Sequence, residues 1–311
     1  MINKNFTIIT FYQFKVILNK QYNYLQLINF CKFNKIKGTI ILADEGINGT
    51  LAGLEKNISE LLIVLQNLKF DDLNIKTSYY SVMPFQKLKI KQKKEIVTLK
   101  TRKAIPEKIS GKKIDYSEWN KIIKDNDTLV IDVRNEFEVS MGSFTGAVNP
   151  KTKNFTDFKA FVKKNLANSK RKKIAMYCTG GIRCEKASSY MIMNGFKNVS
   201  QLNGGIIKYL ENISKNNSFW NGECFVFDER VSLKNELKKG SFKICYGCRE
   251  PISIRDIKSK FYVEGVCCPN CYERISEKKK KNLMERIKQI QLSKKRGEYN
   301  RFIKQTVSDY E

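Results

Sequence analysis

The sequence predicts an α/β protein in which a parallel β-sheet with helices on both faces lies between a smaller α+β domain and a cysteine-rich C-terminal module. Three observations support this prediction. Strand-like and helix-like segments alternate along residues 114–215, a strand-helix-strand-strand-helix-strand order lies within residues 1–100, and two Cys-x2-Cys pairs with a basic helix-like segment occupy residues 216–311. A chain of 311 residues is long enough for two or three domains with cores.

The first 100 residues have the spacing of a small α+β domain. We expect strands at Thr7–Phe14, Lys37–Leu42, Gly49–Leu54 and Ile75–Tyr80, and helices at Gln21–Phe33 and Ser59–Leu68. This order is that of a ferredoxin-like (acylphosphatase-like) split βαβ sandwich. The turn at 43–49 contains Asp44 and Glu45. Turn chemistry alone accounts for its Asp, Asn and Gly residues, so a structural and a functional role for this turn both stay open.

A basic stretch follows the first domain. Leu88–Leu99 alternates lysine with apolar residues and predicts a further strand, and residues 101–113, with Pro106 and Gly111, predict a linker. Alternation on a strand places lysines on one side, which suits a phosphate backbone, although a solvated face is the simpler alternative. The candidate nucleic-acid contacts here are Lys89, Lys91, Arg102 and Lys103.

The central domain is expected to contain the reactive group. The segment Lys173–Tyr177 predicts a short buried strand, and Cys178 stands at its end. The loop that follows consists of Thr179, Gly180, Gly181, Ile182 and Arg183, and a helix is expected over Cys184–Asn194. A cysteine beside a helix N-terminus and an arginine is expected to have a low pKa and to react as a thiolate. The alternative is an ordinary packed cysteine.

Other central segments complete an alternating pattern. We expect a helix capped by Ser117, strands at Leu129–Val133 and Val199–Leu202, and a helix around Phe155–Lys164. In such sheets ligands bind at the carboxyl ends of the strands, where the Cys178 loop would lie. The candidate accessory residues are Asp132, Arg134 and Cys184; Cys184 is either a resolving thiol or a packed cysteine.

Several motifs resemble known proteins. The Asp-x-Arg segment at 132–134, the Gly-x-x-x-Gly-Ala-Val-Asn-Pro segment at 142–150, and the Cys178 loop, with four residues between Cys178 and Arg183, resemble the rhodanese superfamily. Members of that superfamily carry sulfur as a cysteine persulfide. Four segments (43–53, 177–188, 201–209 and 222–231) resemble one branch of it, the bacterial oxygen-dependent tRNA uridine hydroxylases.

This resemblance implies a rhodanese-like fold and hydroxylation of the wobble uridine of tRNA, at position 34, to 5-hydroxyuridine. It implies molecular oxygen as co-substrate and Cys178 as the active-site cysteine, with a persulfide on it by analogy. Arg183 and the loop N–H groups would stabilise developing negative charge. No flavin, haem or nucleotide-binding motif is found. The alternatives are a sulfurtransferase that passes a persulfide to a tRNA base or a thiol, and a non-catalytic tRNA-binding adaptor.

Composition narrows the chemistry further. The chain contains no histidine, which excludes Ser-His and Cys-His pairs and histidine-ligated metals. Nine cysteines without a signal peptide argue against a disulfide framework. The net charge of +27 suggests a tRNA or other polyanionic partner, although a Lys-, Asn- and Ile-rich composition also reflects mutational bias. Without an apolar run long enough for a membrane span, we expect a soluble, cytoplasmic protein.

The C-terminal cysteines have metal-ligand spacing. Cys245, Cys248, Cys268 and Cys271 form two Cys-x2-Cys pairs separated by nineteen residues. Four thiolates in this pattern suit a tetrahedral structural Zn²⁺ in a zinc-ribbon-like module; the alternatives are redox-active thiols or a metal-free remnant. Cys267 is a further candidate ligand, and Cys224 has no assigned role.

The chain ends with a basic segment. Ser276–Arg296 predicts a helix capped by Ser276 and stopped by Gly297, with an apolar stripe of Leu283, Ile287 and Ile290. Arg286 and Lys288 on this helix are candidate tRNA contacts, and a docked helix with a solvated outer face is the alternative.

Overall fold

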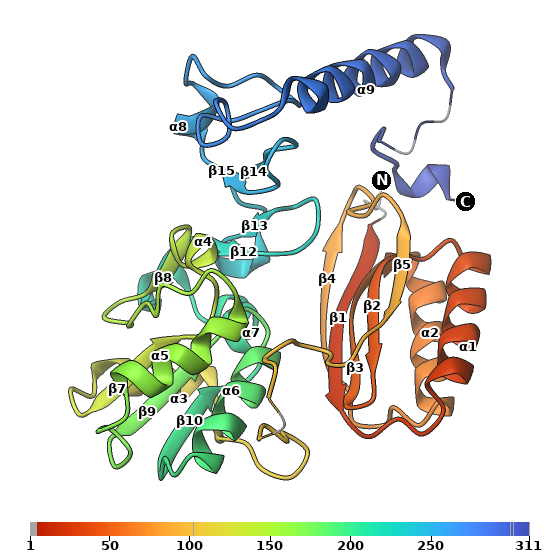
Figure 1. The fold of residues 1–311 in the computed structure, drawn as a ribbon. Helices are drawn as coiled ribbons and strands as arrows, with labels where there is room; N and C mark the ends of the chain where they lie inside the picture. Colours follow the sequence, from red (N-terminus) through yellow and green to blue (C-terminus); the bar gives the residue numbers. More distant parts are fainter. Residues whose placement is uncertain (1–4, 102, 299, 301, 311) are drawn as a thin grey trace.

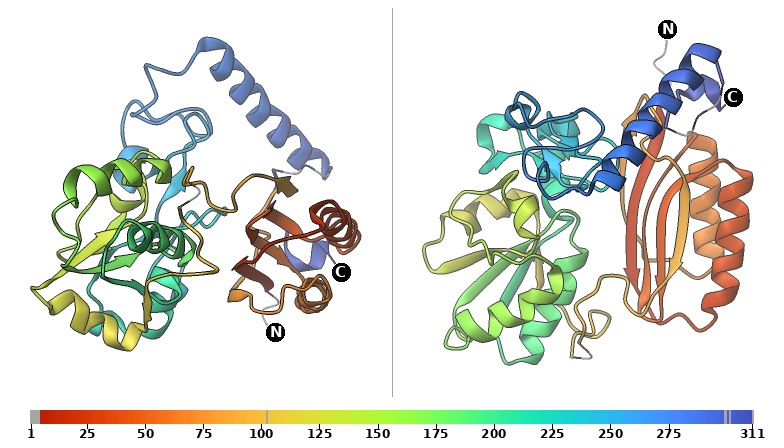
Figure 2. Two further views of the ribbon diagram at one scale, coloured as in Figure 1. Left: turned by 60° about the horizontal axis from the view of Figure 1, so that its bottom comes forward. Right: turned by 45° about the horizontal axis from the view of Figure 1, so that its top comes forward.

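The computed structural model describes the whole chain except residues 1–4, 102, 299, 301 and 311. An N-terminal sheet domain is followed by a central domain and a cysteine module, and the long C-terminal helix then leads back toward the N-terminal domain (Figures 1 and 2). There Met83 N–H donates to Gln305 O (2.9 Å), and the Phe6 and Tyr310 rings meet edge to face. The C-terminal residues therefore contact the N-terminal domain. The N-terminal domain, the central domain and the cysteine module with its C-terminal helix together form a closed ring.

The N-terminal domain confirms the expected ferredoxin-like order. Its elements are β1 (Phe6–Phe14), α1 (Lys20–Phe33), β2 (Lys37–Ala43), β3 (Gly46–Gly53), α2 (Glu55–Asn67), β4 (Asn74–Tyr80) and β5 (Leu88–Gln92). The strands lie in the order β4-β1-β3-β2-β5, and only β5 runs parallel to its neighbour. Both helices cover the face turned away from the central domain, so the opposite face is free of helices (Figure 1).

The basic strand is shorter than its lysine alternation predicted. It ends at Gln92 rather than Leu99. The chain turns because the Glu95 carboxylate accepts hydrogen bonds from the N–H groups of Leu99 (2.9 Å) and Lys100 (2.9 Å). A side chain that bonds its own backbone in this way competes with a strand ladder.

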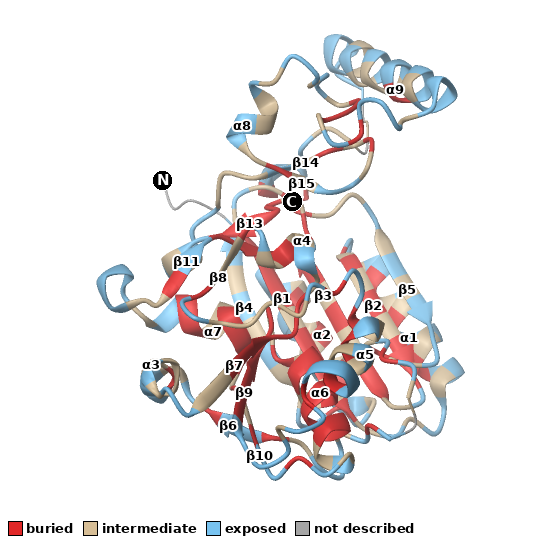
Figure 3. Cartoon of the chain, turned by 60° about the vertical axis from the view of Figure 1, so that its left-hand side comes forward, coloured by how far each residue is buried: buried red, intermediate tan, exposed pale blue. Residues whose placement is uncertain are grey.

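The central domain contains a parallel sheet in the order β6-β10-β9-β7. Its elements are β6 (Lys112–Ile114), α3 (Tyr116–Lys124), β7 (Thr128–Asp132), α4 (Glu136–Val139), β8 (Gly142–Phe144), α5 (Phe158–Asn165), β9 (Lys173–Tyr177), α6 (Ile182–Met193), β10 (Asn198–Leu202) and α7 (Gly205–Asn212). Separate apolar clusters cover its two faces. The central strand β9 is mostly buried (Figure 3).

Three local expectations for this domain were wrong. Lys112 and Lys113, expected within a linker, form the edge strand β6 together with Ile114. Helix α3 begins at Tyr116, after Asp115, so Ser117 lies within its first turn and does not cap it. Helix α6 begins at Ile182 because Gly181 adopts a φ of +104°, which lets the chain enter the helix directly from the loop.

The C-terminal part begins by extending the central domain. Strand β11 (Trp220–Gly222) pairs with β8, and Trp220 and Cys224 join the central core. The remaining elements are β12 (Cys224–Phe225), β13 (Ser232–Leu233), β14 (Lys243–Ile244), β15 (Pro251–Ile252), α8 (Ile254–Ile257) and α9 (Glu277–Arg296). Short 3-10 turns lie at Phe155–Asp157, Lys215–Asn217, Asn235–Leu237 and Val307–Asp309.

Helix α9 confirms the predicted basic helix. Ser276 Oγ accepts the Lys279 N–H, and Gly297 ends the helix at a φ of +67°. Leu283 is buried and most of the helix surface is exposed (Figure 3). In the part of the chain that the structure describes, neither α9 nor any other helix has the length and apolar character needed to cross a bilayer.

Candidate active site between two domains

Cys178 lies at the carboxyl end of β9, at the entrance to α6. Its side chain is fully buried, and the Gly181 N–H donates to its sulfur (3.1 Å). The carbonyl groups of the loop are held from the other side, because Ile206 N–H donates to Cys178 O (3.0 Å) and Ile207 N–H to Thr179 O (3.1 Å). The loop is therefore fixed between two helix N-termini, with its N–H groups turned toward the sulfur.

This environment favours the thiolate. Burial alone would raise the pKa of Cys178. Hydrogen bonds from the side chain and backbone of Cys184, the positive charge of Arg183 and the Gly181 N–H outweigh burial and lower that pKa to about 6. The surroundings of Cys178 therefore favour its thiolate form.

Arg183 is paired with a carboxylate that the sequence did not single out. Its guanidinium donates to both oxygens of Glu138, at 2.6 and 2.8 Å, and to Thr179 Oγ1 at 3.2 Å. All of these groups are buried. The bidentate pair fixes the guanidinium behind the loop, so Arg183 acts on Cys178 through its charge and through the position of Thr179. The only sequence signal for Glu138 was its place soon after the Asp-x-Arg segment.

Asp132 and Arg134 form a second buried ion pair. Arg134 Nη2 lies 2.6 Å from Asp132 Oδ2, and both side chains are almost completely inaccessible. The same guanidinium donates to Glu138 O and Gly142 O and lies 5.0 Å from the Trp220 ring. The structure therefore places Asp132 and Arg134 beneath the loop, where they support the segment that carries Glu138.

The two other central cysteines differ from Cys178. Burial, reinforced by the neighbouring Cys178 thiolate, raises the pKa of Cys184 well above its ordinary value. Cys184 therefore remains a thiol that donates to Cys178. Burial also raises the pKa of Cys224 to about 12, and its sulfur contacts Phe225 O in the apolar core. All nine cysteines are free in this structure.

The N-terminal domain covers this loop with the helix-free face of its sheet. Tyr12 on β1 donates to Glu185 Oε1 (2.9 Å), and a Cβ atom on Gly181 would lie 2.9 Å from the Tyr12 oxygen. Beside them Lys186 is buried, with Nζ 2.6 Å from Glu45 and 2.6 Å from Glu95. Glu45 belongs to the turn whose role was open, and the structure gives it this contact between domains.

A lysine from the same face lies in the cavity beside the loop. Lys76 on β4 donates to Asn74 Oδ1 (2.5 Å), and its ammonium lies 5.5 Å from the centre of the Tyr12 ring. Burial lowers the pKa of Lys76 to about 8, against the opposing effect of the Cys178 and Glu185 charges. The cavity has a volume of about 60 Å³ and is lined by Lys76, Thr10, Thr50 and Thr179, among others. No local pattern in the sequence links these residues.

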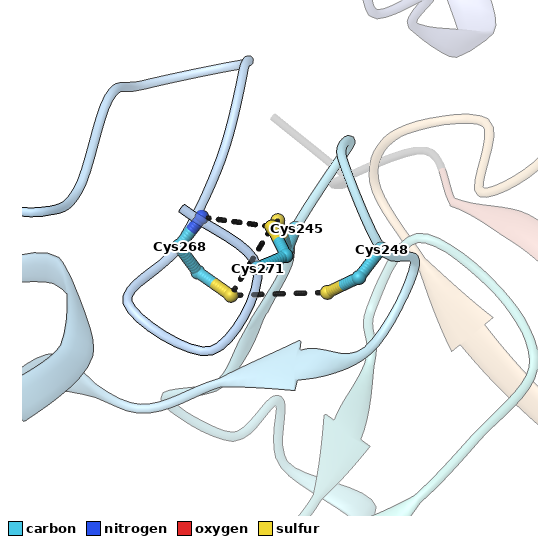
Figure 4. Close-up of side chains that lie close together, drawn as sticks. All are labelled: Cys245, Cys248, Cys268 and Cys271. Carbon is cyan, nitrogen blue, oxygen red and sulfur yellow. Dashed lines mark hydrogen bonds between the residues drawn. The ribbon is translucent and has the colours of Figure 1, made fainter. Parts of the chain in front are cut away.

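The four cysteines of the C-terminal module converge as predicted (Figure 4). Their sulfurs lie within 4.8 Å of one another, and three sulfur pairs are 3.7, 3.7 and 3.8 Å apart. A tetrahedron with Zn–S bonds of about 2.3 Å has S–S edges of about 3.8 Å, so this donor set can hold a metal such as zinc. Cys267 is turned away, with its sulfur 3.9 Å from Phe261 O, and is not a fourth-ligand alternative.

The candidate tRNA contacts separate into groups. Lys89 and Arg286 line one large cavity, in which Arg286 stacks between the rings of Tyr246 (4.6 Å) and Phe302 (5.1 Å). Lys91 and Lys103 are exposed, as is Lys288 on α9, but these three do not line that cavity. Arg102 lies outside the described residues.

Two protein-family models match the N-terminal and central domains of this chain. The model described as UPF0176 acylphosphatase like domain matches residues 6–96, and the model described as rhodanese-like domain matches residues 115–212. Among solved structures, a rhodanese-like domain protein from Staphylococcus aureus is 25% identical, with a TM-score of 0.26 over 32% of this chain and 90% of that chain. A protein from Anabaena sp. is 20% identical, with a TM-score of 0.30 over 35% of this chain and 91% of that chain.

A curated relative covers nearly the whole chain. The tRNA uridine(34) hydroxylase of Teredinibacter turnerae is 45% identical over 295 residues, which make up 94% of this chain and 92% of the relative. This chain belongs to the tRNA uridine(34) hydroxylase family.

Proposed function

We propose that this protein is a tRNA-modifying oxidoreductase that hydroxylates the wobble uridine to 5-hydroxyuridine with molecular oxygen. One observation supports this most strongly: a buried cysteine with a pKa of about 6 lies beneath a second domain, in a chain that is similar to a tRNA uridine(34) hydroxylase along nearly its whole length. The similarity to a tRNA uridine(34) hydroxylase favours hydroxylation over sulfur transfer. Because tRNA and free thiols are typical of the cytoplasm, we also infer that the protein acts there.

The thiolate supplies the first chemical step. Cys178 Sγ adds to C6 of the uracil ring and forms a C–S bond, while the electron pair of the C5–C6 double bond moves toward C5 and O4. C5 then has enolate character and forms a C–O bond with molecular oxygen. With two electrons and two protons from an external thiol reductant the O–O bond breaks, so that one oxygen atom stays on C5 as the hydroxyl group and the other leaves as water. Loss of the C5 proton to solvent then returns an electron pair to the C5–C6 bond, the C–S bond breaks and the thiolate leaves.

Residues of both domains stabilise this charge. The Lys76 ammonium lines the cavity beside Thr179, so it is placed to act on the anionic uracil oxygen, while Arg183 acts through its charge. Tyr12 remains a neutral phenol because burial and Glu185 raise its pKa, and it holds the helix that follows the loop. An unpaired anticodon base can leave its stack to reach such a buried site.

The cysteine module has a structural role in this proposal. We infer that Cys245, Cys248, Cys268 and Cys271 bind Zn²⁺, because the sulfur separations match its tetrahedral geometry. Four thiolates fill the coordination shell, so the metal fixes the fold of the module and leaves the uridine chemistry to Cys178.

The experiment that tests the function uses purified protein, unmodified tRNA and isotopically labelled oxygen gas. Labelled oxygen at C5 of the wobble uridine supports the proposal. A thiolated nucleoside formed equally well without oxygen would instead identify a sulfurtransferase and contradict it.

A further inference from the structure

A row of polar residues crosses the helix-free face of the N-terminal sheet. The strand registers place Thr10 opposite Lys76 and Thr50, and Thr39 opposite Thr50 and Lys89. In strand order the row is Lys76, Thr10, Thr50, Thr39 and Lys89. Neighbouring hydroxyls are in contact, with Thr10 Oγ1 3.2 Å from Thr50 Oγ1. Four strand spacings give this row a length of about 19 Å.

The row joins two cavities. Lys76, Thr10 and Thr50 line the small cavity beside Thr179 of the reactive loop. Thr39 and Lys89 line the large cavity, of about 1080 Å³, which lies between β5 and the cysteine module. Residues 226–228 line both cavities, so this segment marks the passage from one to the other.

The large cavity combines positive charge with aromatic rings. Seven Lys and Arg side chains line it, against three Asp and Glu side chains, one of which, Asp228, is already paired with Arg230. Seven Phe and Tyr side chains are interleaved with the cations, including Tyr246 and Phe302 on either side of Arg286. Cations that track a backbone beside rings that stack on bases are the features by which proteins bind single-stranded nucleic acid.

Phe227 occupies the passage. Its side chain is 66% exposed although Phe225, which it meets edge to face at 4.9 Å, is buried. The loop that carries it is held tightly. Val226 N–H donates to Val231 O, and Arg230 Nη1 donates to Ser78 Oγ on β4. An exposed ring on so well-fixed a loop, between two cavities, is suited to a ligand with flat faces.

We propose that this passage is the track for the unpaired nucleotides that flank the target uridine, with Phe227 as the stacking platform for the neighbouring base. The target base enters the small cavity, the adjacent base stacks on Phe227, and the following phosphates lie along Lys89 and the cations of the large cavity. The threonine row offers hydroxyls to phosphate or 2′-OH groups. This inference rests on the proposed function for the identity of the RNA and extends it to the residues that select a single strand.

The test is a binding measurement under anaerobic conditions, without turnover. The probe is an anticodon stem-loop RNA with 2-aminopurine next to the target uridine, titrated with the full-length protein. The wild-type protein should quench the fluorophore by stacking. Phe227→Ala should relieve this quenching and raise Kd by about 5-fold to 150-fold, which corresponds to the loss of one base–aromatic stack. Phe227→Trp should retain both the quenching and the wild-type Kd.

Matched variants separate this site from general effects. Lys89→Ala should lower the slope of log Kd against log salt concentration by about one, whereas Lys56→Ala, an exposed lysine on α2, should leave it unchanged. Phe33→Ala removes a ring that is 88% exposed at the end of α1 and should not alter quenching. The same RNA annealed to its complement should compete poorly.

The outcomes distinguish the two proposals. Wild-type quenching and affinity in Phe227→Ala, or equal competition by the duplex, would overturn the track even if the enzyme hydroxylates uridine. If quenching depends on Phe227 but labelled oxygen is never incorporated, the track stands and the proposed reaction fails.

Discussion

Lys186, on the helix that follows the reactive loop, contacts Glu45 in the β2–β3 turn of the N-terminal domain, with Nζ 2.6 Å from Oε1. Glu95 binds the same ammonium at 2.6 Å, and Val97 O accepts a further hydrogen bond. A buried ammonium with this many partners is satisfied only when the two domains are docked. The contact therefore couples the domain that covers the site to helix α6, which follows the Cys178 loop.

Glu45→Gln should weaken this docking. Loss of one charge beside a buried ammonium is expected to lower the free energy of unfolding by about 1–3 kcal/mol and to increase the rate of Cys178 alkylation. Denaturant titration and thiol labelling measure the two effects. Asp44→Asn is the control, because Asp44 is largely exposed in its pair with Lys20 and should change stability by less than about 1 kcal/mol. Equal effects of the two variants would contradict this role.

Alkylation of Cys178 should follow its lowered pKa. The rate with iodoacetamide should rise with a midpoint near pH 6, well below the ordinary thiol value of 9.0, because only the thiolate reacts. Cys184→Ala removes a hydrogen-bond donor to the sulfur and should move the midpoint upward. A wild-type midpoint near pH 9 would show that the loop does not stabilise the thiolate.

Cys267 provides a control for the four-cysteine cluster, because it lies next to Cys268 in the chain. Cys268→Ser should release the bound metal and lower Tm, because the remaining sulfurs no longer complete a tetrahedron. Cys267→Ser should retain the metal, since the Cys267 sulfur faces Phe261 O. Elemental analysis with thermal unfolding measures both. Equal metal content in the two variants, or none in the wild type, would refute the assignment.

Lys76→Met should separate activity from stability. Removal of the ammonium should lower kcat by a factor of about 10²–10³, the usual effect of losing one donor to a developing oxyanion, and Lys76→Arg should retain more activity.

The same substitution, Lys76→Met, should increase the stability of the fold. The wild-type lysine has a pKa of about 8 in the fold against 10.5 ordinarily, so wild-type stability rises with pH between these values. Lys76→Met should thus be the more stable protein at pH 7, and this advantage should shrink by pH 10.

The outcome for Lys76→Met is read from initial rates and from thermal unfolding at both pH values. A variant with wild-type kcat would remove Lys76 from the catalytic account. An advantage in stability that does not vary with pH would show that the lysine is not desolvated in the fold.

Sequence reasoning found what local patterns encode. Alternating apolar positions identified most strands and helices, the spacing of Cys178 and Arg183 identified the loop, and the paired cysteines identified the four-cysteine cluster. The positions of element ends were missed where side chains decided them, as when Glu95 ended β5. Edge strand β6, only three residues long, carried too short a signal.

The second half of the site was not predictable from local patterns. Tyr12 and Glu185 are 173 residues apart, and Lys76 reaches the cavity only because two domains dock. In the sequence, Glu138 is only one more polar residue of a short helix. Its role is visible only in the fold, which brings Arg183 into contact with it. Contacts of this kind depend on tertiary packing and leave no periodicity in the sequence.

In the proposed reaction the Cys178 thiolate is the group that makes hydroxylation of the wobble uridine possible. The most direct test is nucleoside mass spectrometry of tRNA from cells that lack the gene, complemented with the wild-type protein or with Cys178→Ser, each shown to be folded by thermal unfolding. The account predicts that 5-hydroxyuridine-derived nucleosides at the wobble position return with the wild type alone. Their return with Cys178→Ser would contradict it.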